Sequence, residues 1–145
     1  MSMRTVLKGD RGELALEILD YENPRAQSVE DSNWLRANLT IQAGPFSGSI
    51  EFGLTTDELA VLSSQLSTVM SSLSGQVRFA TMEGNWMLNV DFERSGTAIV
   101  SGMMTSNRTL GNKLLYELRA DPIALEPVVG DVARMTSMYP VRSAP

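Results

Sequence analysis

Residues 54–75 read LTTDELAVLSSQLSTVMSSLSG, and this stretch decides the fold because it is the clearest helix in the chain. Its apolar residues recur every three or four positions, which places them on one helix face: Leu59, Leu62, Leu66, Val69 and Leu73. Thr55 and Glu58 have the spacing of a capping box, and Gly75 is suited to the C-cap. The pattern predicts a helix over residues 56–74.

Stretches on both sides of this helix alternate apolar and polar residues, as half-buried strands do. Three precede it, at residues 13–20, 34–42 and 46–54, and four follow it, at 76–82, 86–93, 97–105 and 113–120. The turns between neighbouring stretches are short, which favours antiparallel pairing. A second helix is predicted over residues 123–138, with Pro127 near its start and Pro140 beyond its end.

This order of elements predicts an α+β fold, in which two helices pack on the apolar face of a curved, mostly antiparallel sheet of about seven strands. Residues 1–145 are expected to form a single domain with flexible ends at about 1–8 and 141–145. The junctions at residues 54–61 and 118–125 share a pattern of apolar residues around Asp57 and Asp121. That likeness suggests two strand–Asp–helix half-repeats.

Composition restricts the chemistry. The chain has 145 residues, of which 43% are hydrophobic, so it can bury a core of ordinary size. It has no cysteine and no histidine, which excludes disulfides, zinc sites of thiolate or imidazole type and a histidine base. We therefore expect no enzymatic activity and no cofactor.

The charge and the hydropathy of the chain bear on its partners and its location. A formal net charge of −5 disfavours nucleic acid and favours a protein partner with a basic surface. The chain contains neither an apolar stretch of membrane-spanning length nor an export signal, so a cytoplasmic location is expected.

Two pairs of carboxylates have the spacing of neighbours on one strand face: Glu13 with Glu17, and Asp91 with Glu93. Such pairs could flank a substrate in a carboxylate-dependent hydrolase or hold a cation. Strand alternation alone also accounts for them as solvated faces, and we favour that interpretation. Arg36, on the polar face of its strand, is likewise interpreted as solvated or salt-bridged.

Two features are candidates for a partner surface. On the first helix a stripe of small residues lies nearly opposite the apolar face: Ala60, Ser64, Ser67, Ser71 and Ser74. Small side chains would let a partner or a second copy of the chain approach closely, although a plain exposed serine face would look the same. Trp34 precedes Leu35, which is in register with the apolar face, so Trp34 could cover an end of the core or anchor a partner. The polar strand face around Glu13, Glu17 and Arg36 is a further candidate surface.

The chain resembles the WapI-type immunity proteins, which accompany wall-associated and related polymorphic toxins of bacteria. The pieces that carry the resemblance are residues 14–24 (LALEILDYENP), 33–35 (NWL), 50–59 (IEFGLTTDEL), 118–121 (LRAD) and 139–142 (YPVR). The resemblance implies an antidote that binds the toxic domain of a cognate toxin and blocks it without chemistry. Toxin domains of this kind are often nucleases, whose basic surfaces suit an acidic partner.

A small-ligand-binding domain is an alternative function. Its pocket would lie inside the curved sheet and be lined by Met82, Met87, Met103 and Met104. A deep apolar cavity between sheet and helices would distinguish this alternative from an immunity protein.

Overall fold

The computed structural model describes residues 3–25, 28–106 and 111–142, which form two four-stranded antiparallel sheets and two long helices. The first sheet consists of β1 (Met3–Gly9), β2 (Gly12–Tyr21), β3 (Trp34–Ala43) and β4 (Phe46–Thr55), and a short helix, α1 (Val29–Ser32), lies between β2 and β3. Helix α2 (Thr56–Ser72) leads to the second sheet, formed by β5 (Val77–Ala80), β6 (Trp86–Phe92), β7 (Ala98–Met104) and β8 (Leu114–Ala120). A 3-10 turn (Pro122–Ala124) and helix α3 (Leu125–Met138) follow.

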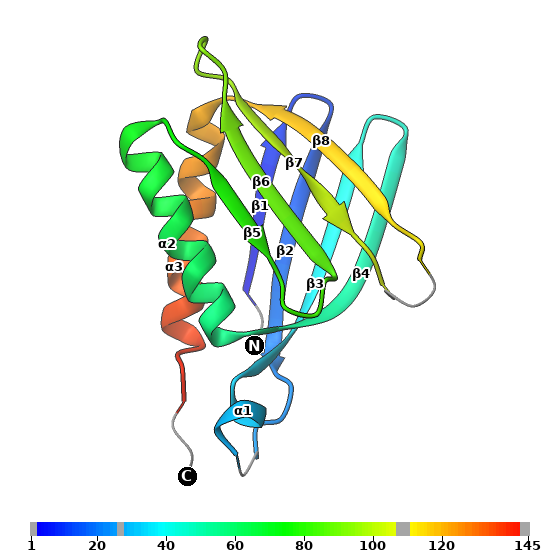
Figure 1. Ribbon diagram of the computed structural model, residues 1–145, viewed down its shortest axis with the longest axis vertical. Helices are drawn as coiled ribbons and strands as arrows, with labels where there is room; N and C mark the ends of the chain where they lie inside the picture. Colours follow the sequence, from blue (N-terminus) through cyan, green and yellow to red (C-terminus); the bar gives the residue numbers. More distant parts are fainter. Residues whose placement is uncertain (1–2, 26–27, 107–110, 143–145) are drawn as a thin grey trace.

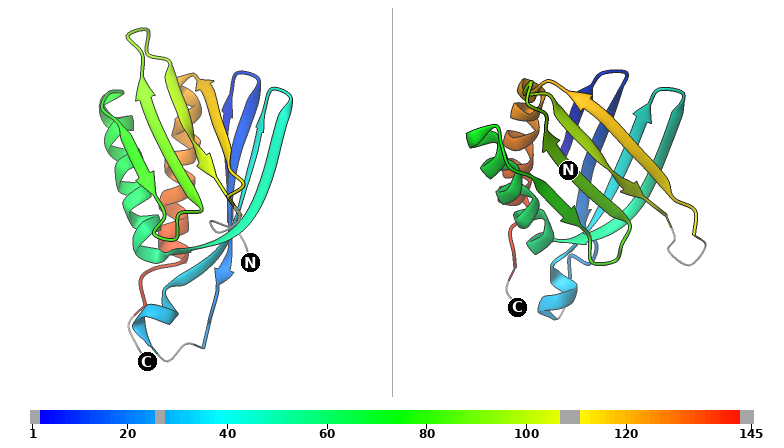
Figure 2. Two further views of the ribbon diagram at one scale, coloured as in Figure 1. Left: turned by 45° about the vertical axis from the view of Figure 1, so that its right-hand side comes forward. Right: turned by 45° about the horizontal axis from the view of Figure 1, so that its top comes forward.

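The two sheets form two layers, and the helices close one side of the space between them. In Figure 1 the β5–β8 sheet lies in front of the β1–β4 sheet, with its strands crossing those behind, and α2 and α3 run side by side at the left. The views in Figure 2 show the same arrangement, with α2 beside β5 and α3 beside β1. A β-bridge between Asp10 and Arg119 joins the β1–β2 turn to β8. No helix in the described part of the chain is long and apolar enough to cross a membrane.

The core fills this space because one face of every element is apolar. Strand alternation turns Leu14, Leu16 and Ile18 of β2 inward, and β3 does the same with its own alternate residues. Helix α2 contributes Leu59, Leu62, Leu66 and Val69, and α3 contributes Leu125, Val128, Val132 and Met135. Polar groups in the core are paired: for example, the Thr5 hydroxyl of β1 donates to Asp131 Oδ2 of α3 at 2.9 Å.

Helix α2 begins as the sequence predicts and ends earlier. Thr55 Oγ1 accepts a hydrogen bond from the Glu58 amide at 3.1 Å, and the Thr55 amide donates to Glu58 Oε1 at 3.2 Å, so the capping box is confirmed. The helix ends at Ser72, and Leu73 occupies the left-handed C-cap conformation with φ 51°. The assignment of Gly75 as the C-cap was wrong, and Leu73, 48% exposed, does not belong to the buried face.

The α+β class is confirmed, and the sheet differs in two ways from the prediction. There are two sheets of four strands rather than one curved sheet of about seven. The additional strand is β1, which pairs with β2 from Met3↔Ile18 to Gly9↔Gly12, although its residues were expected to lie in a flexible end. At the other end, Val141 and Arg142 follow α3 without regular structure, and residues 143–145 lie outside the described residues, as do residues 1–2.

The two halves of the chain have the same order of strands and helix, but the residue-by-residue alignment proposed from the sequence does not hold. Each half consists of four antiparallel strands followed by a helix. Thr55 caps α2, whereas Asp121, whose side chain accepts from the Ile123 amide at 3.0 Å, caps the turn before α3. The pattern aligned Leu59 with Ile123, yet Leu59 is buried and Ile123 is 66% exposed. Helix α3 therefore starts at Leu125, two residues later than predicted.

Candidate partner-binding site

Four of the predicted surface residues lie on one sheet face but do not form one cluster, because Glu13 lies across from Gln42, at the far end of β3 from Trp34. Glu13 and Glu17 of β2 and Trp34 and Arg36 of β3 share the outer face of the β1–β4 sheet. Glu13 lies directly across from Lys8 of β1, and Glu17 from Arg4. The Arg36 guanidinium lies 3.5 Å from Glu51 Oε1 on β4. Basic residues thus accompany the carboxylates of this face, and Arg36 is salt-bridged, one of the two alternatives that the sequence left.

The predicted stripe of small residues lies elsewhere, on α2, which packs against α3 and β5, except that Ser74 follows the end of the helix and was wrongly assigned to the stripe. All five of its members are exposed: Ala60, Ser64, Ser67, Ser71 and Ser74. Two of the four serine hydroxyls bond locally: Ser71 Oγ donates to the Thr68 carbonyl at 2.8 Å and Ser74 Oγ donates to Ser72 Oγ at 3.1 Å. The stripe remains a candidate partner surface.

The second carboxylate pair is engaged by arginines from other strands. Asp91 Oδ1 of β6 lies 2.6 Å from Arg78 Nη2 of β5. Glu93 Oε1 lies 2.6 Å from Arg119 Nη1 of β8. These two ion pairs lie on the solvent side of the β5–β8 sheet, which is the arrangement that the solvated-face interpretation describes.

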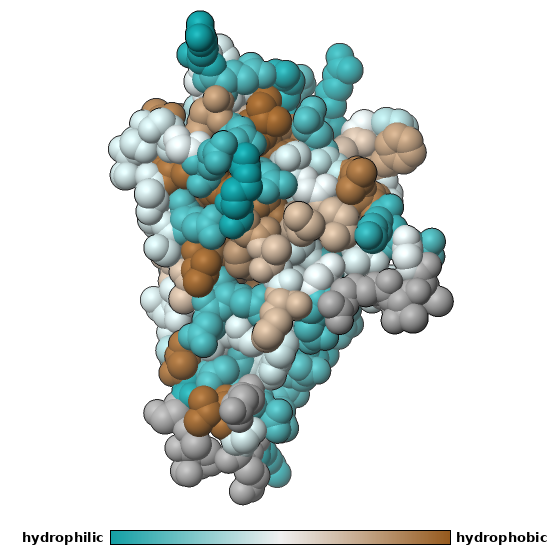
Figure 3. Space-filling view, viewed as in Figure 1, coloured by the Kyte–Doolittle hydropathy of each residue, from teal (hydrophilic) through white to brown (hydrophobic). Residues whose placement is uncertain are grey.

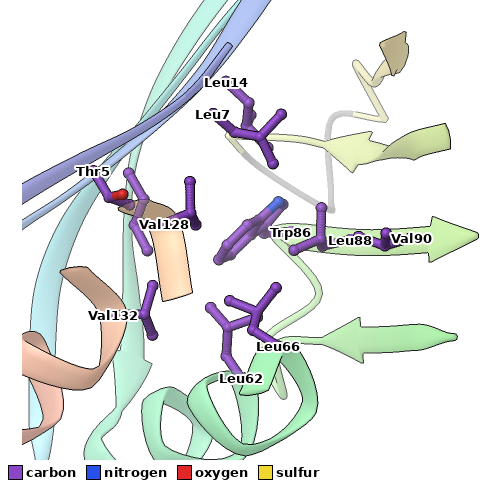
Figure 4. Close-up of a pocket in the computed structure, with 11 residues that line it drawn as sticks. Thr5, Leu7, Leu14, Leu62, Leu66, Trp86, Leu88, Val90, Val128 and Val132 are labelled. Atoms are coloured by element: carbon purple, nitrogen blue, oxygen red, sulfur yellow. The ribbon is translucent and has the colours of Figure 1, made fainter. Parts of the chain in front are cut away.

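The methionine-lined pocket is a wrong prediction. Met82 is 68% exposed and Met87 is 40% exposed, while Met104 is buried in the core. The interior does contain a small cavity of about 30 Å³, and Figure 4 shows its lining side chains converging on Trp86 from both sheets and both helices. That volume suits about one water molecule. Ligand pockets are about ten times larger, so this cavity gives no support to a small-ligand-binding function.

Trp86 and Tyr116 form a polar link next to this cavity. The Trp86 indole N–H donates to the Tyr116 hydroxyl at 3.0 Å, and that hydroxyl donates to the Met87 carbonyl at 2.7 Å. Burial raises the pKa of Tyr116 above its ordinary value. Gly102 lies between them without a side chain, because a Cβ there would come within 1.9 Å of the Met87 carbonyl oxygen. Trp86 is therefore a core residue.

The outer face of the β5–β8 sheet carries an apolar row. The strand register places Ala80, Met87, Met103 and Leu115 side by side across the four strands. Leu115 is 78% exposed, and Figure 3 shows apolar surface across the middle of this face, interrupted by hydrophilic side chains. The row is narrow, because the next row of the register contains Arg78, Asn89, Ser101 and Glu117.

Two hollows lie at the end of the molecule where Trp34 opens β3. One hollow, of about 430 Å³, is lined by Glu22, Asn23, Asp31, Trp34 and Glu83. A second, of about 380 Å³, shares Glu22 and Glu83 with the first and extends to Arg36, Glu51, Phe52, Gly53, Asn85 and Ser106. We call the two together the Trp34 groove. Sequence reasoning found Trp34 and Arg36 as surface candidates but did not assign Glu22, Asp31 and Glu83 to a common site, because the first two lie in the β2–β3 connection and the third in the β5–β6 turn.

The loop that forms one wall of this groove is fastened by the end of the chain. The Arg142 amide donates to Asn33 Oδ1 at 2.6 Å, and Asn33 Nδ2 donates to the Arg142 carbonyl at 2.9 Å. The Arg142 guanidinium lies 3.7 Å from the centroid of the Tyr21 ring, and its Nε donates to the Ser32 carbonyl at 2.8 Å. Figure 1 shows α1 and the C-terminal segment at the same end of the molecule. We call this cluster the Arg142 latch.

The Arg142 latch also affects the ionisation of its aromatic members. Burial is the main cause that raises the pKa of Tyr21, and the Arg142 guanidinium partly offsets it. Tyr139, edge-on to Tyr21 with ring centroids 5.6 Å apart, has its pKa raised by burial and by Asp20. These tyrosines therefore stay neutral at physiological pH, and the Tyr21 hydroxyl donates to the Pro140 carbonyl at 2.7 Å.

Comparison with models of protein families gives a match over most of the chain. The model of the immunity protein WapI-like family matches residues 5–140. No curated protein matches the chain. Among solved structures, one described as crystal structures of Trypanosoma bruciei MRP1/MRP2 has a TM-score of 0.49 and 11% identity, covering 94% of this chain and 85% of that chain. A likeness at that level carries no functional argument.

Proposed function

The chain belongs to the WapI-like immunity protein family, and from that premise we propose that it binds the toxic domain of a cognate bacterial toxin and blocks it. The observation that carries the proposal is the extent of the family match, which runs from within β1 to the second residue after α3. An antidote of this kind would act in the cytoplasm of the cell that makes the toxin. The partner would present a basic surface, since the chain has a net charge of −5.

We also propose that blocking involves no catalysis by this chain. The support is that Asp91 and Glu93 each form an ion pair on the solvent side of a sheet, and that Glu13 lies opposite Lys8. A variant with amides at all four candidate carboxylates should therefore protect as well as the parent: Glu13→Gln, Glu17→Gln, Asp91→Asn and Glu93→Gln. Hydrolase turnover by the purified parent that disappears in this variant would contradict the non-catalytic mechanism.

The decisive experiment is co-expression with a defined toxin domain. The C-terminal domain of the toxin encoded beside this chain in its genome is expressed from an inducible promoter, with and without the chain. We expect growth to be restored only when the chain is present, and the two purified proteins to form a complex. Unrestored growth together with no measurable complex would contradict the proposed function. A toxin domain with an inactivated site provides the control for complex formation without toxicity.

A further inference from the structure

Trp34 provides a flat surface inside the Trp34 groove. It lies on the outer side of β3, and its ring packs beside Gly53 of the neighbouring strand. A Cβ at Gly53 would be in ordinary van der Waals contact with the ring, 3.4 Å from Trp34 Cε3, and would lie 3.8 Å from Glu83 Oε1. The indole and the Glu83 carboxylate therefore lie close to the same point of β4. The indole is half-buried, so part of it remains open to a partner.

The charges of the groove are not balanced within the chain. In the described part of the chain, Glu22, Asp31 and Glu83 form no ion pair, and the one cation that lines the groove, Arg36, is paired with Glu51. Elsewhere, Asp91, Glu93 and Asp131 each have an arginine partner. The groove thus gathers three carboxylates that have no ion pair in the described part of the chain around an aromatic surface.

Three separate parts of the fold hold these groups in place. Trp34 belongs to β3, and Glu83 lies in the β5–β6 turn, where the Met82 amide donates to Glu58 Oε2 at 2.9 Å. Glu22 and Asp31 belong to the loop that the Arg142 latch fastens through Ser32 and Asn33. A groove built in this way is largely formed before a partner arrives, which lowers the entropic cost of binding.

We propose that the Trp34 groove receives an arginine side chain of the protein partner, with the guanidinium stacked on Trp34 and paired with Glu22, Asp31 or Glu83. The proposal rests on the proposed function for the identity of that partner as a toxin domain. A planar guanidinium fits better than a lysine ammonium, because it stacks on an aromatic face and donates hydrogen bonds to carboxylates from its edge. The carboxylates would repel phosphate, so the groove selects a basic protein surface over nucleic acid.

The first test needs no toxin. The full-length chain is titrated with the peptide Ac-Gly-Arg-Gly-Arg-Gly-NH₂, and the two tryptophan indole N–H signals are followed by NMR. Trp86 is the internal control, because its N–H is bonded to Tyr116 in the core. We expect a saturable shift of the Trp34 signal only. The peptide with citrulline, a neutral isostere, in place of arginine should produce no such shift. An unmoved Trp34 signal would overturn the proposal.

Two triple variants with the same change in net charge distinguish binding in the groove from attraction to the overall charge of the chain. The groove variant carries Glu22→Gln, Asp31→Asn and Glu83→Gln. The control variant changes three exposed acids outside the groove: Asp10→Asn, Glu117→Gln and Glu126→Gln. We expect the arginine-peptide shift to disappear in the groove variant and to persist in the control. Equal losses in both would show that the peptide senses only the overall charge, and would overturn the proposal.

The second test uses the cognate toxin domain. Trp34→Ala should weaken its affinity about 30-fold, the size of effect seen for tryptophan hot spots, and the groove triple variant should also weaken it. Cooperative unfolding of each variant confirms that it is folded. Parent-like affinity of both variants would overturn the groove while leaving the immunity function intact. If the parent itself neither binds nor protects, the immunity function fails, and the peptide titration still decides whether the groove takes arginine.

Discussion

Replacing Arg142 with alanine should loosen the loop beside the Trp34 groove without unfolding the rest of the chain. The substitution removes the guanidinium, which donates from Nε to the Ser32 carbonyl at 2.8 Å and from Nη1 to the Pro24 carbonyl at 3.3 Å. It also removes the contact with the Tyr21 ring. The two hydrogen bonds between Asn33 and the Arg142 backbone can remain, so the variant isolates the side-chain part of the latch.

The expected loss is about 2 kcal/mol. A hydrogen bond from a charged donor is worth about 1.5–3 kcal/mol when buried, and Arg142 is half exposed, so about 1–1.5 kcal/mol is reasonable for its bonds to carbonyls. A cation–π contact at a partly exposed site adds about 0.5–1 kcal/mol. For a chain of this length, about 2 kcal/mol corresponds to a decrease of about 8 °C in Tm.

Urea unfolding and amide hydrogen exchange together test this prediction. Arg94→Ala is the matched control, because Arg94 is exposed in the β6–β7 turn and has no ion pair in the described part of the chain. It removes the same charge and should change stability by less than about 0.5 kcal/mol. Arg142→Ala should also speed exchange in residues 28–33 and weaken binding of the arginine peptide. Equal midpoints and equal exchange in the two variants would refute the latch.

Three further predictions follow from individual contacts. Leu62 faces the core and is 1% exposed. Leu62→Asp would bury an unpaired charge, so it should abolish cooperative unfolding in a urea titration. A cooperative transition would show that the helix face is misassigned. Burial raises the pKa of Tyr116 in the folded chain, so above pH 10 this tyrosine ionises in the unfolded chain first. The free energy of unfolding should therefore fall with rising pH, and should fall less in Tyr116→Phe. Identical slopes of unfolding free energy against alkaline pH in the two proteins would contradict this. Higher salt should slow association with the toxin domain more than it changes dissociation. Ser67→Arg should instead raise the dissociation rate, and stopped-flow or surface-binding kinetics measure both rates. An unchanged dissociation rate for Ser67→Arg would show that the α2 stripe is not part of the interface.

Sequence patterns correctly predicted the elements that are stabilised by residues close together in the chain. The capping box at Thr55 and Glu58 formed as expected, because both partners lie within one turn of α2. Strand β1 was missed because its inward residues include Thr5, a polar side chain whose core position depends on Asp131, far along the chain. The division into two sheets was also invisible. Alternation shows which hairpins form, but whether β4 and β5 join one sheet depends on how α2 packs between them.

The candidate site was likewise predicted only in part from the sequence. The sequence left Trp34 either covering an end of the core or anchoring a partner, and in the structure its side chain is half-buried and lines the groove. The acidic walls of the groove could not be predicted, because Glu22 and Asp31 come from the β2–β3 connection and Glu83 from the β5–β6 turn, and only the folded chain brings them together. The carboxylates that the sequence did single out, Asp91 and Glu93, form ion pairs with arginines of other strands, Arg78 of β5 and Arg119 of β8. Spacing within one strand does not reveal such cross-strand partners.

The two most specific pieces of the family resemblance, residues 33–35 and 139–142, meet in the Arg142 latch. Asn33 and Arg142 bond directly to each other, whereas Trp34, the next residue, points into the groove. The residues that carry the resemblance therefore include those that hold the β2–β3 loop in place. The unpaired acidic residues of the groove lie in connections that contribute little to the core. Side chains on those loops can change without creating a cavity or burying a charge, so a different toxin could be accommodated by changing the groove acids while the latch keeps its form.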